Sequence, residues 1–86
     1  NAADMPTCEL TDDDFREGTI DILDILHKSG LAGSRSEARR NVEQGGVSVD
    51  GNAVNDVKAV FAKESLEGEG VVVKRGKKKF VKVIAK

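Results

Sequence analysis

The chain has 86 residues, of which 38% are hydrophobic, and its formal net charge is -1. This length supports one small domain. The single cysteine, Cys8, excludes a disulfide framework and a thiolate metal cage and favours a reducing, cytoplasmic setting. No apolar run approaches the roughly 18 to 20 residues of a membrane span, so we expect no membrane partner.

The charge is unevenly distributed along the chain. Residues 1–27 contain eight acids and one base, whereas residues 28–86 contain seven acids and thirteen bases. Residues 1–18 are polar and acidic and are interrupted by Pro6, a composition that favours a flexible linker. We therefore predict a linker over residues 1–18 and a basic folded domain over 19–86, whose first candidate partner is nucleic acid.

A first helix is predicted directly after this segment. Thr19 is suited to cap its start, and the helix would run to Leu26 or Lys28 with Ile22 on its apolar face. Gly30 is expected to end it, because glycine readily adopts the left-handed conformation found after helices.

A second helix is predicted over residues 35–44. Ser34 and Glu37 form an S-x-x-E capping box at its start. At about 100 degrees per residue, Ala38 and Val42 form a narrow apolar stripe, Arg35 and Arg39 flank it on one side, one turn apart, and Arg40 points away from it.

Strand patterns follow the second helix. Val47 and Val49 alternate with polar residues before a turn at Gly51. Residues 53–68 carry no clear pattern and are expected to form a loop or an irregular strand. The residues expected to reach the core from this segment are Val57, Val60 and Phe61.

The C-terminal segment VVVKRGKKKFVKVI, residues 71–84, predicts two strands joined at Gly76, a hairpin with a basic tip. Phe80 is expected in the core, with stacking on a partner as the alternative. Together these elements predict an α+β fold in which two short helices pack on a small, mainly antiparallel sheet.

No residue pattern supports a catalytic or metal site. His27 has no cysteine or second histidine at ligand spacing, so we expect an exposed helix residue. The aspartates at 12–14 lack the glycine and glutamate of a calcium loop, and GLAGS at 30–34 follows no strand. We therefore expect this chain to need no cofactor.

The basic residues allow two interpretations. Arg35, Arg39 and Arg40 are either a solvated helix face, with Arg39 and Glu43 paired one turn apart, or a phosphate site near the start of the helix. The lysines of the hairpin either protect strand edges from pairing or follow a phosphate backbone.

The stretch LHKSGLAGSRSEARRNVEQGGVSVDG, residues 26–51, closely resembles the signature of the S-four RNA-binding domain, which is named after a small-subunit ribosomal protein. The matching positions are Leu26, Ser34, Arg35, Ala38, Arg39, Gly45, Val47, Val49 and Gly51. The resemblance implies an S-four-like (alpha-L) fold and RNA binding. Asp50 departs from the asparagine that the family commonly has before this glycine.

Further features, ARR, QGGV and the terminal RGKKKFVKV, resemble the C-terminal end of bacterial tyrosyl-tRNA synthetases. That resemblance implies a non-catalytic domain that grips tyrosine tRNA, through its long variable arm, for a catalytic domain located upstream. ATP and magnesium would be bound only by that upstream domain. The isolated domain is expected to be a monomer, and the whole synthetase a homodimer through its catalytic domain.

The residues assigned to RNA binding lie on the second helix and on the hairpin. They are Ser34, Arg35, Ser36, Arg39, Arg40, Gln44, Lys74, Arg75, Lys77, Lys78, Lys79 and Lys82. Two other functions use the same surface and stay open from the sequence: a stand-alone or ribosome-associated RNA-binding protein, and a protein-interaction module with acidic partners.

Overall fold

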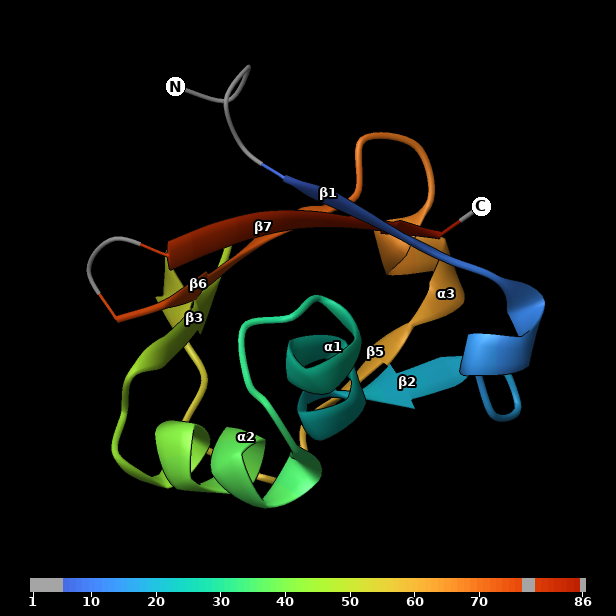
Figure 1. Cartoon of the computed structure of the whole chain (residues 1–86). Helices are drawn as coiled ribbons and strands as arrows, with labels where there is room; N and C mark the ends of the chain where they lie inside the picture. The colour runs from blue at the N-terminus through green and yellow to red at the C-terminus, as the bar shows by residue number, and fades with distance from the viewer. Residues whose placement is uncertain (1–5, 77–78, 86) are drawn as a thin grey trace.

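The computed structural model describes residues 6–76 and 79–85. It confirms the predicted α+β class (Figure 1). The strands are β1 (Thr7–Leu10), β2 (Thr19–Asp21), β3 (Val47–Val49), β4 (Asn52–Ala53), β5 (Val60–Ala62), β6 (Val71–Arg75) and β7 (Lys79–Ala85). The helices are the 3-10 helix η2 (Asp12–Asp14) and the α-helices α1 (Ile22–Lys28), α2 (Arg35–Glu43) and α3 (Lys63–Leu66).

Five strands form the main sheet, in the order β1-β7-β6-β3-β4, and β2 and β5 form a separate antiparallel pair. The pairings within the main sheet are antiparallel except that of β1 with β7. Figure 1 shows the three α-helices on one side of this sheet. The core lies between them and contains alternate strand residues such as Val73, Val81 and Val83 together with Ile25 and Val42 of the helices.

The first helix begins two residues later than predicted. Thr19 lies in β2, where it pairs with Ala62, and is not the cap. Asp21 caps α1 instead, because its carboxylate accepts a hydrogen bond of 2.7 Å from the backbone N–H of Asp24. Gly30 follows the helix with φ +82°, as expected for the residue that ends it.

The second helix and its Ser34 cap confirm the prediction, but only one of the two hydrogen bonds of the predicted capping box forms. The hydroxyl of Ser34 accepts a hydrogen bond of 3.1 Å from the N–H of Glu37. The carboxylate of Glu37 accepts from the N–H of Gly33, one residue before the cap. Ala38 and Val42 are fully buried, so the apolar stripe faces the core.

The N-terminal segment differs from the predicted flexible linker. Residues 7–10 form β1, parallel to β7, and the N–H of Lys82 donates to the carbonyl of Pro6 at 2.9 Å. Leu10 is only 1% exposed. Backbone pairing with β7 satisfies the N–H and C=O groups of this strand, and Leu10 together with the partly buried Cys8 packs against the core. The boundary predicted at residue 18 stays a prediction, and β1 makes it testable.

Cys8 provides a chemical probe of β1. Its thiol lies 3.5 Å from the carbonyl oxygen of Lys28, at the end of α1. Burial, reinforced by the negative charge of Asp14, raises the pKa of the Cys8 thiol, and the nearby positive charge of Lys28 offsets part of this rise. A raised pKa leaves less thiolate, which is the reactive form.

We therefore expect iodoacetamide to alkylate Cys8 more slowly at pH 8 in the folded chain than in urea. An Asp14→Asn variant should react faster than the wild type when folded, because it removes one cause of the raised pKa. Mass spectrometry of timed samples measures both rates. Equal rates for the folded and unfolded chains would contradict the docking of β1.

Residues 53–68, expected to form a loop or an irregular strand, contain the strand β5 and the short helix α3. β5 pairs with β2, and α3 buries Leu66 completely. Val57 and Phe61 are partly buried against the core, as expected. The prediction for Val60 was wrong: it is 60% exposed, because it lies on the side of β5 that faces away from the core.

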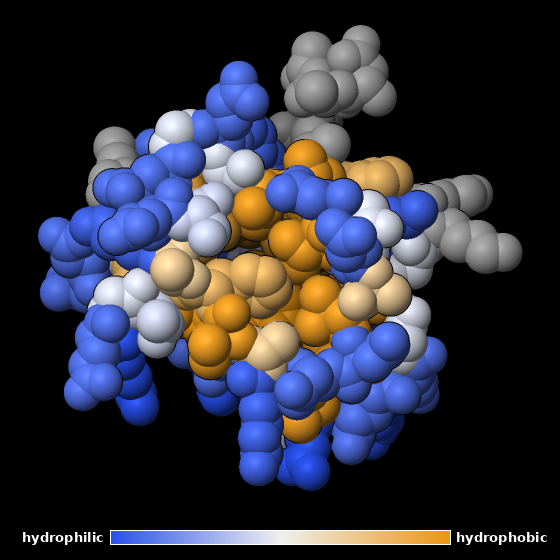
Figure 2. All heavy atoms as spheres, turned by 180° about the vertical axis from the view of Figure 1, so that it is seen from behind, coloured by the Kyte–Doolittle hydropathy of each residue, from blue (hydrophilic) through white to orange (hydrophobic). Residues whose placement is uncertain are grey.

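The face seen from behind in Figure 2 has an apolar area at its centre, surrounded by hydrophilic side chains. Val60 and Phe80 are the large hydrophobic residues most exposed among those that the structure describes. No α-helix in the described ranges is long and apolar enough to cross a membrane.

The predicted hairpin is confirmed as β6 and β7, with Val73 opposite Val81. Gly76 has φ +71° at the turn, and the predicted tip residues Lys77 and Lys78 lie outside the described residues. The core prediction for Phe80 was wrong. Its register places it on the helix-free side of the sheet, where it is 38% exposed.

The turn after β3 explains Asp50. Asp50 and Gly51 both have positive φ, at 51° and 85°, a combination typical of tight hairpin turns. The N–H of Asp50 donates to the carbonyl of Val72 at 2.8 Å, and the N–H of Val72 donates to the Asp50 carboxylate at 2.9 Å. Asp50 therefore fastens the turn to β6.

Candidate nucleic-acid interface

Helix α2 presents its arginines to solvent, as predicted. Arg35, Arg39 and Arg40 are all exposed, on a helix whose buried side is Ala38 and Val42. Ser34, Ser36 and Gln44 are also exposed on or beside this helix. The residues of the predicted interface that come from the second helix are therefore all exposed on or beside α2.

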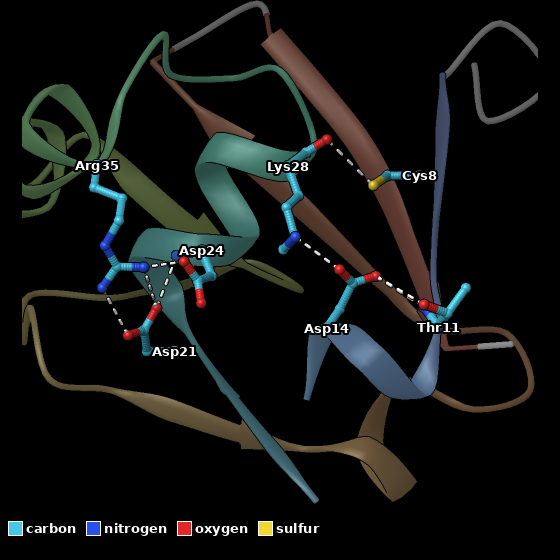
Figure 3. Close-up of polar contacts among 7 residues, drawn as sticks. All are labelled: Cys8, Thr11, Asp14, Asp21, Asp24, Lys28 and Arg35. Atoms are coloured by element: carbon cyan, nitrogen blue, oxygen red, sulfur yellow. Dashed lines mark hydrogen bonds and ion pairs between the residues drawn. The ribbon is translucent and has the colours of Figure 1, made fainter. Parts of the chain in front are cut away.

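Arg35 differs from the other two arginines because it is held by carboxylates. Its guanidinium pairs with Asp21 at 3.0 Å and also contacts Asp24 (Figure 3). Asp21 and Asp24 lie at the start of α1, so these ion pairs join α1 to α2. The side chain of Arg35 is 50% exposed, which keeps the ion pairs screened and individually weak.

A cavity of about 430 Å³ beside these ion pairs argues against a phosphate site there. Its charged lining residues are Asp14, Asp21, Asp24, Arg16 and Arg35, which makes three acids and two bases. A phosphate in this cavity would meet a net negative lining. A role for Arg35 in RNA binding stays a prediction, and it would require the guanidinium to leave both carboxylates.

Arg39 and Arg40 are the available cations of α2. Arg39 lies 3.7 Å from Glu43, a long and exposed contact that contributes a few tenths of a kcal/mol at most, about 0.3 to 0.5. Within the described ranges, Arg40 has no ion pair. Both guanidinium groups can therefore reach a ligand without the loss of a strong internal contact.

The register of the hairpin divides its cations between two sides of the sheet. Arg75 and Lys79 are paired with each other and alternate with buried Val73 and Val81, so they lie on the side of the helices. Lys74 and Lys82 lie on the opposite side. The sequence predicted one basic hairpin, whereas the strands present two separate basic surfaces.

The end of α2 and the hairpin meet directly. The N–H of Gly76 donates to the carbonyl of Gly46 at 2.7 Å. A groove of about 310 Å³ begins at this contact and runs over β3 and β6. Its lining residues include Gly45, Gly46, Ser48, Lys74 and Gly76. The two predicted basic elements are thus neighbours in space.

The acidic residues near the N-terminus are partly structural. Asp14 pairs with Lys28 at 2.7 Å, and this hydrogen bond, with one from the N–H of Thr11, lowers the pKa of Asp14 (Figure 3). Lys63 contacts Asp12, and that contact raises the pKa of the lysine. His27 is exposed, as predicted, and the described residues contain no group of three or more potential metal ligands.

Sequence reasoning missed Asp21 and Asp24 as partners of Arg35. Both carboxylates lie eleven or more residues before the arginine, and no local pattern links them to it. The available signal was their position at a helix start, where carboxylates are common because they cap the free N–H groups. That signal would have identified Asp21 as the cap of α1, but not its ion pair with Arg35.

The chain matches the family model described as the tyrosine-tRNA ligase SYY-like C-terminal domain over residues 1–83. It is 40% identical over 81 residues to a tyrosine-tRNA ligase of Treponema denticola, covering 93% of this chain and 20% of that protein. It is 43% identical over 77 residues to the tyrosine-tRNA ligase of Lachnoclostridium phytofermentans, covering 88% and 18%. A ligase of Clostridium botulinum is 35% identical over 80 residues, covering 93% and 19%.

The chain spans about a fifth of the length of these curated relatives. The match includes α1, α2 and the β6–β7 hairpin up to Val83, which are the elements that carry the candidate interface. The chain belongs to the family of tyrosine-tRNA ligase SYY-like C-terminal domains.

Proposed function

We propose that this chain is the tRNA-binding domain of a tyrosine-tRNA ligase. The observation that carries the proposal is the family match over residues 1–83. The geometry supports it, since the exposed arginines of α2 and the β6–β7 hairpin, whose Lys79 is exposed on the side of the helices, meet at the contact between Gly46 and Gly76. A basic surface of this kind suits the phosphates of structured RNA.

The ligand that we propose is tyrosine tRNA, held by its long variable arm through phosphate and shape contacts. The domain would position the tRNA, while a separate catalytic domain of the ligase attaches tyrosine and binds ATP and magnesium. We further propose a cytoplasmic setting, a monomeric isolated chain, and a ligase that dimerises through its catalytic domain.

Arg39 and Arg40 should provide phosphate contacts that depend strongly on salt. A double Arg39→Ala/Arg40→Ala variant should reduce the slope of log affinity against log salt by about 1.5, since each lost contact removes about 0.7 to 0.9. Between 50 and 200 mM salt, the salt-induced loss of affinity should then shrink by a factor of about eight. Filter binding of tyrosine tRNA over this range measures the slope.

An Arg16→Ala/Lys63→Ala variant is the matched control. It also removes two positive charges, but from residues beside β2 and in α3, which are not part of α2 or the hairpin. Its slope should stay close to that of the wild type. Equal slopes for all three proteins would show that α2 is only a solvated helix face.

Two further comparisons test the ligand itself. A tyrosine tRNA whose variable arm has been shortened should bind more weakly than the intact molecule. An acidic peptide that binds as tightly as tRNA would instead favour a protein-interaction module.

A further inference from the structure

The side of the main sheet that faces away from the α-helices carries a coherent set of side chains. We call this side the outer face. Its members alternate with the buried strand residues and are Thr7, Glu9, Ser48, Ala53, Val72, Lys74, Phe80, Lys82 and Ile84. The α-helices lie on the other side of the sheet in Figure 1.

The centre of the outer face combines an aromatic ring with cations. Ser48, Lys74 and Phe80 are direct neighbours across β3, β6 and β7. The ammonium nitrogen of Lys74 lies 5.3 Å from the centre of the Phe80 ring. Lys82 follows Phe80 by two residues on the same side of β7, which places it about 7 Å further along the strand.

Phe80 is the most exposed aromatic residue in the described part of the chain. The chain has three phenylalanines and no other aromatic residue, and Phe80 is 38% exposed. Phe15 and Phe61, by contrast, are partly buried against the core. A ring that is exposed between two lysines resembles the platforms on which unpaired bases stack, with phosphates held by neighbouring cations.

The groove described above opens beside this ring. Lys74 lines the groove together with Ser48, Gly45 and Gly76, and its ammonium group lies over the Phe80 ring. The glycines leave backbone exposed and take little space. The groove therefore offers room for a sugar or phosphate next to a base that covers Phe80.

The charge on the outer face favours an anion at this end. Lys74 and Lys82 flank Phe80, whereas Glu9 pairs with Ile84, four residues from Phe80 along β7. That separation corresponds to about 13 Å. Because Glu9 is a diagonal neighbour of Lys82, Lys74 is the cation beside Phe80 that lies farther from this carboxylate.

We propose that the outer face binds one unpaired RNA nucleotide, whose base stacks on Phe80 while Lys74 and Lys82 hold its phosphates. The base would replace the Lys74 ammonium over the ring. This exchange is favourable, because an exposed cation–π contact is weaker than stacking of a base on an aromatic ring. The choice of RNA rests on the proposed function, but the site is separate from the α2 arginines.

A tryptophan reporter tests the proposal directly, because the chain contains no tryptophan. In a Phe80→Trp variant, single-stranded octauridylate should quench the tryptophan emission, and an RNA duplex of eight base pairs should quench it far less. Ser65→Trp is the matched control. Ser65 is exposed on α3, which lies on the other side of the main sheet.

Affinity supplies the second measurement. Phe80→Ala should weaken octauridylate binding about 5- to 100-fold, as expected for the loss of one stacked base. Phe80→Leu keeps apolar bulk without a π-face and should bind as weakly as the alanine variant. Circular dichroism confirms that each variant is folded.

The proposal would be overturned by tryptophan emission at position 80 that is unchanged when octauridylate is bound, or by a Phe80→Leu variant with wild-type affinity. Quenching by an acidic peptide but not by RNA would likewise overturn it, and would assign the outer face to a protein partner. Tyrosine tRNA binding that depends on Arg39 and Arg40 would survive each of these results, so the two proposals fail separately.

Discussion

A Leu10→Ala variant is expected to be less stable than the wild type by about 2 to 5 kcal/mol in its free energy of unfolding. Leu10 is 1% exposed and lies at the end of β1, a strand of only four residues. The truncation removes its buried side chain and leaves a cavity that the sheet can close only in part. A chain of this length has a total stability of roughly 4 to 13 kcal/mol, so the loss is large.

Urea unfolding followed by circular dichroism measures this loss. Thr7→Ala is the matched control, since Thr7 lies on the same strand but is exposed. The control should change the free energy of unfolding by less than about 0.5 kcal/mol. A Leu10→Ala variant as stable as the control would show that residues 1–18 are a flexible linker, as their composition predicts.

The second helix illustrates what the sequence predicts well. Its cap at Ser34, its apolar stripe of Ala38 and Val42, and its exposed arginines all depend on residues within four positions of one another. Capping and helical periodicity are local properties, so they survive in any surrounding fold. The β6–β7 hairpin was predictable for the same reason.

The elements that were missed depend on contacts between distant residues. β1 pairs with the last strand of the chain through backbone groups, and Thr7 lies opposite Lys82. Its sequence, TCEL, alternates polar and apolar residues over only four positions, the shortest run that indicates a strand, and this run lies in an otherwise acidic segment. The later start of α1 has a similar cause. Thr19 lies in β2 and pairs with the distant Ala62, so Asp21 is the cap of the helix.

The candidate interface was predictable as a set of residues but not as a surface. The sequence groups all hairpin cations, whereas the strand register separates Lys74 and Lys82 from Arg75 and Lys79. The sequence also does not distinguish Arg35 from Arg39 as a phosphate ligand. In the structure, Asp21 and Asp24 form ion pairs with Arg35 but not with Arg39. Which side of a strand a residue occupies depends on pairing with partners that only the fold supplies.

Gly70, just before β6, is the position where a single methyl group should cause the greatest damage. A Cβ atom there would lie 2.2 Å from the carbonyl oxygen of Val83 and 2.3 Å from the side chain of Ile84. Gly70 also has φ +70°, which L-residues adopt only with strain. The carbonyl oxygen of Val83 belongs to the backbone of β7, where Val83 pairs with Val71 of β6. Rotation of a side chain therefore cannot remove this clash.

We therefore expect Gly70→Ala to lower the free energy of unfolding by about 2 to 5 kcal/mol, the sum of about 1 to 2 for the left-handed backbone and about 1 to 3 for overpacking. Gly68→Ala separates the two causes, because Gly68 has nearly the same φ, +75°, but no atom within 4 Å of the added Cβ. It should lose only the backbone component. Urea unfolding of both variants measures the difference, and equal losses would show that Gly70 does not approach β7 closely in solution.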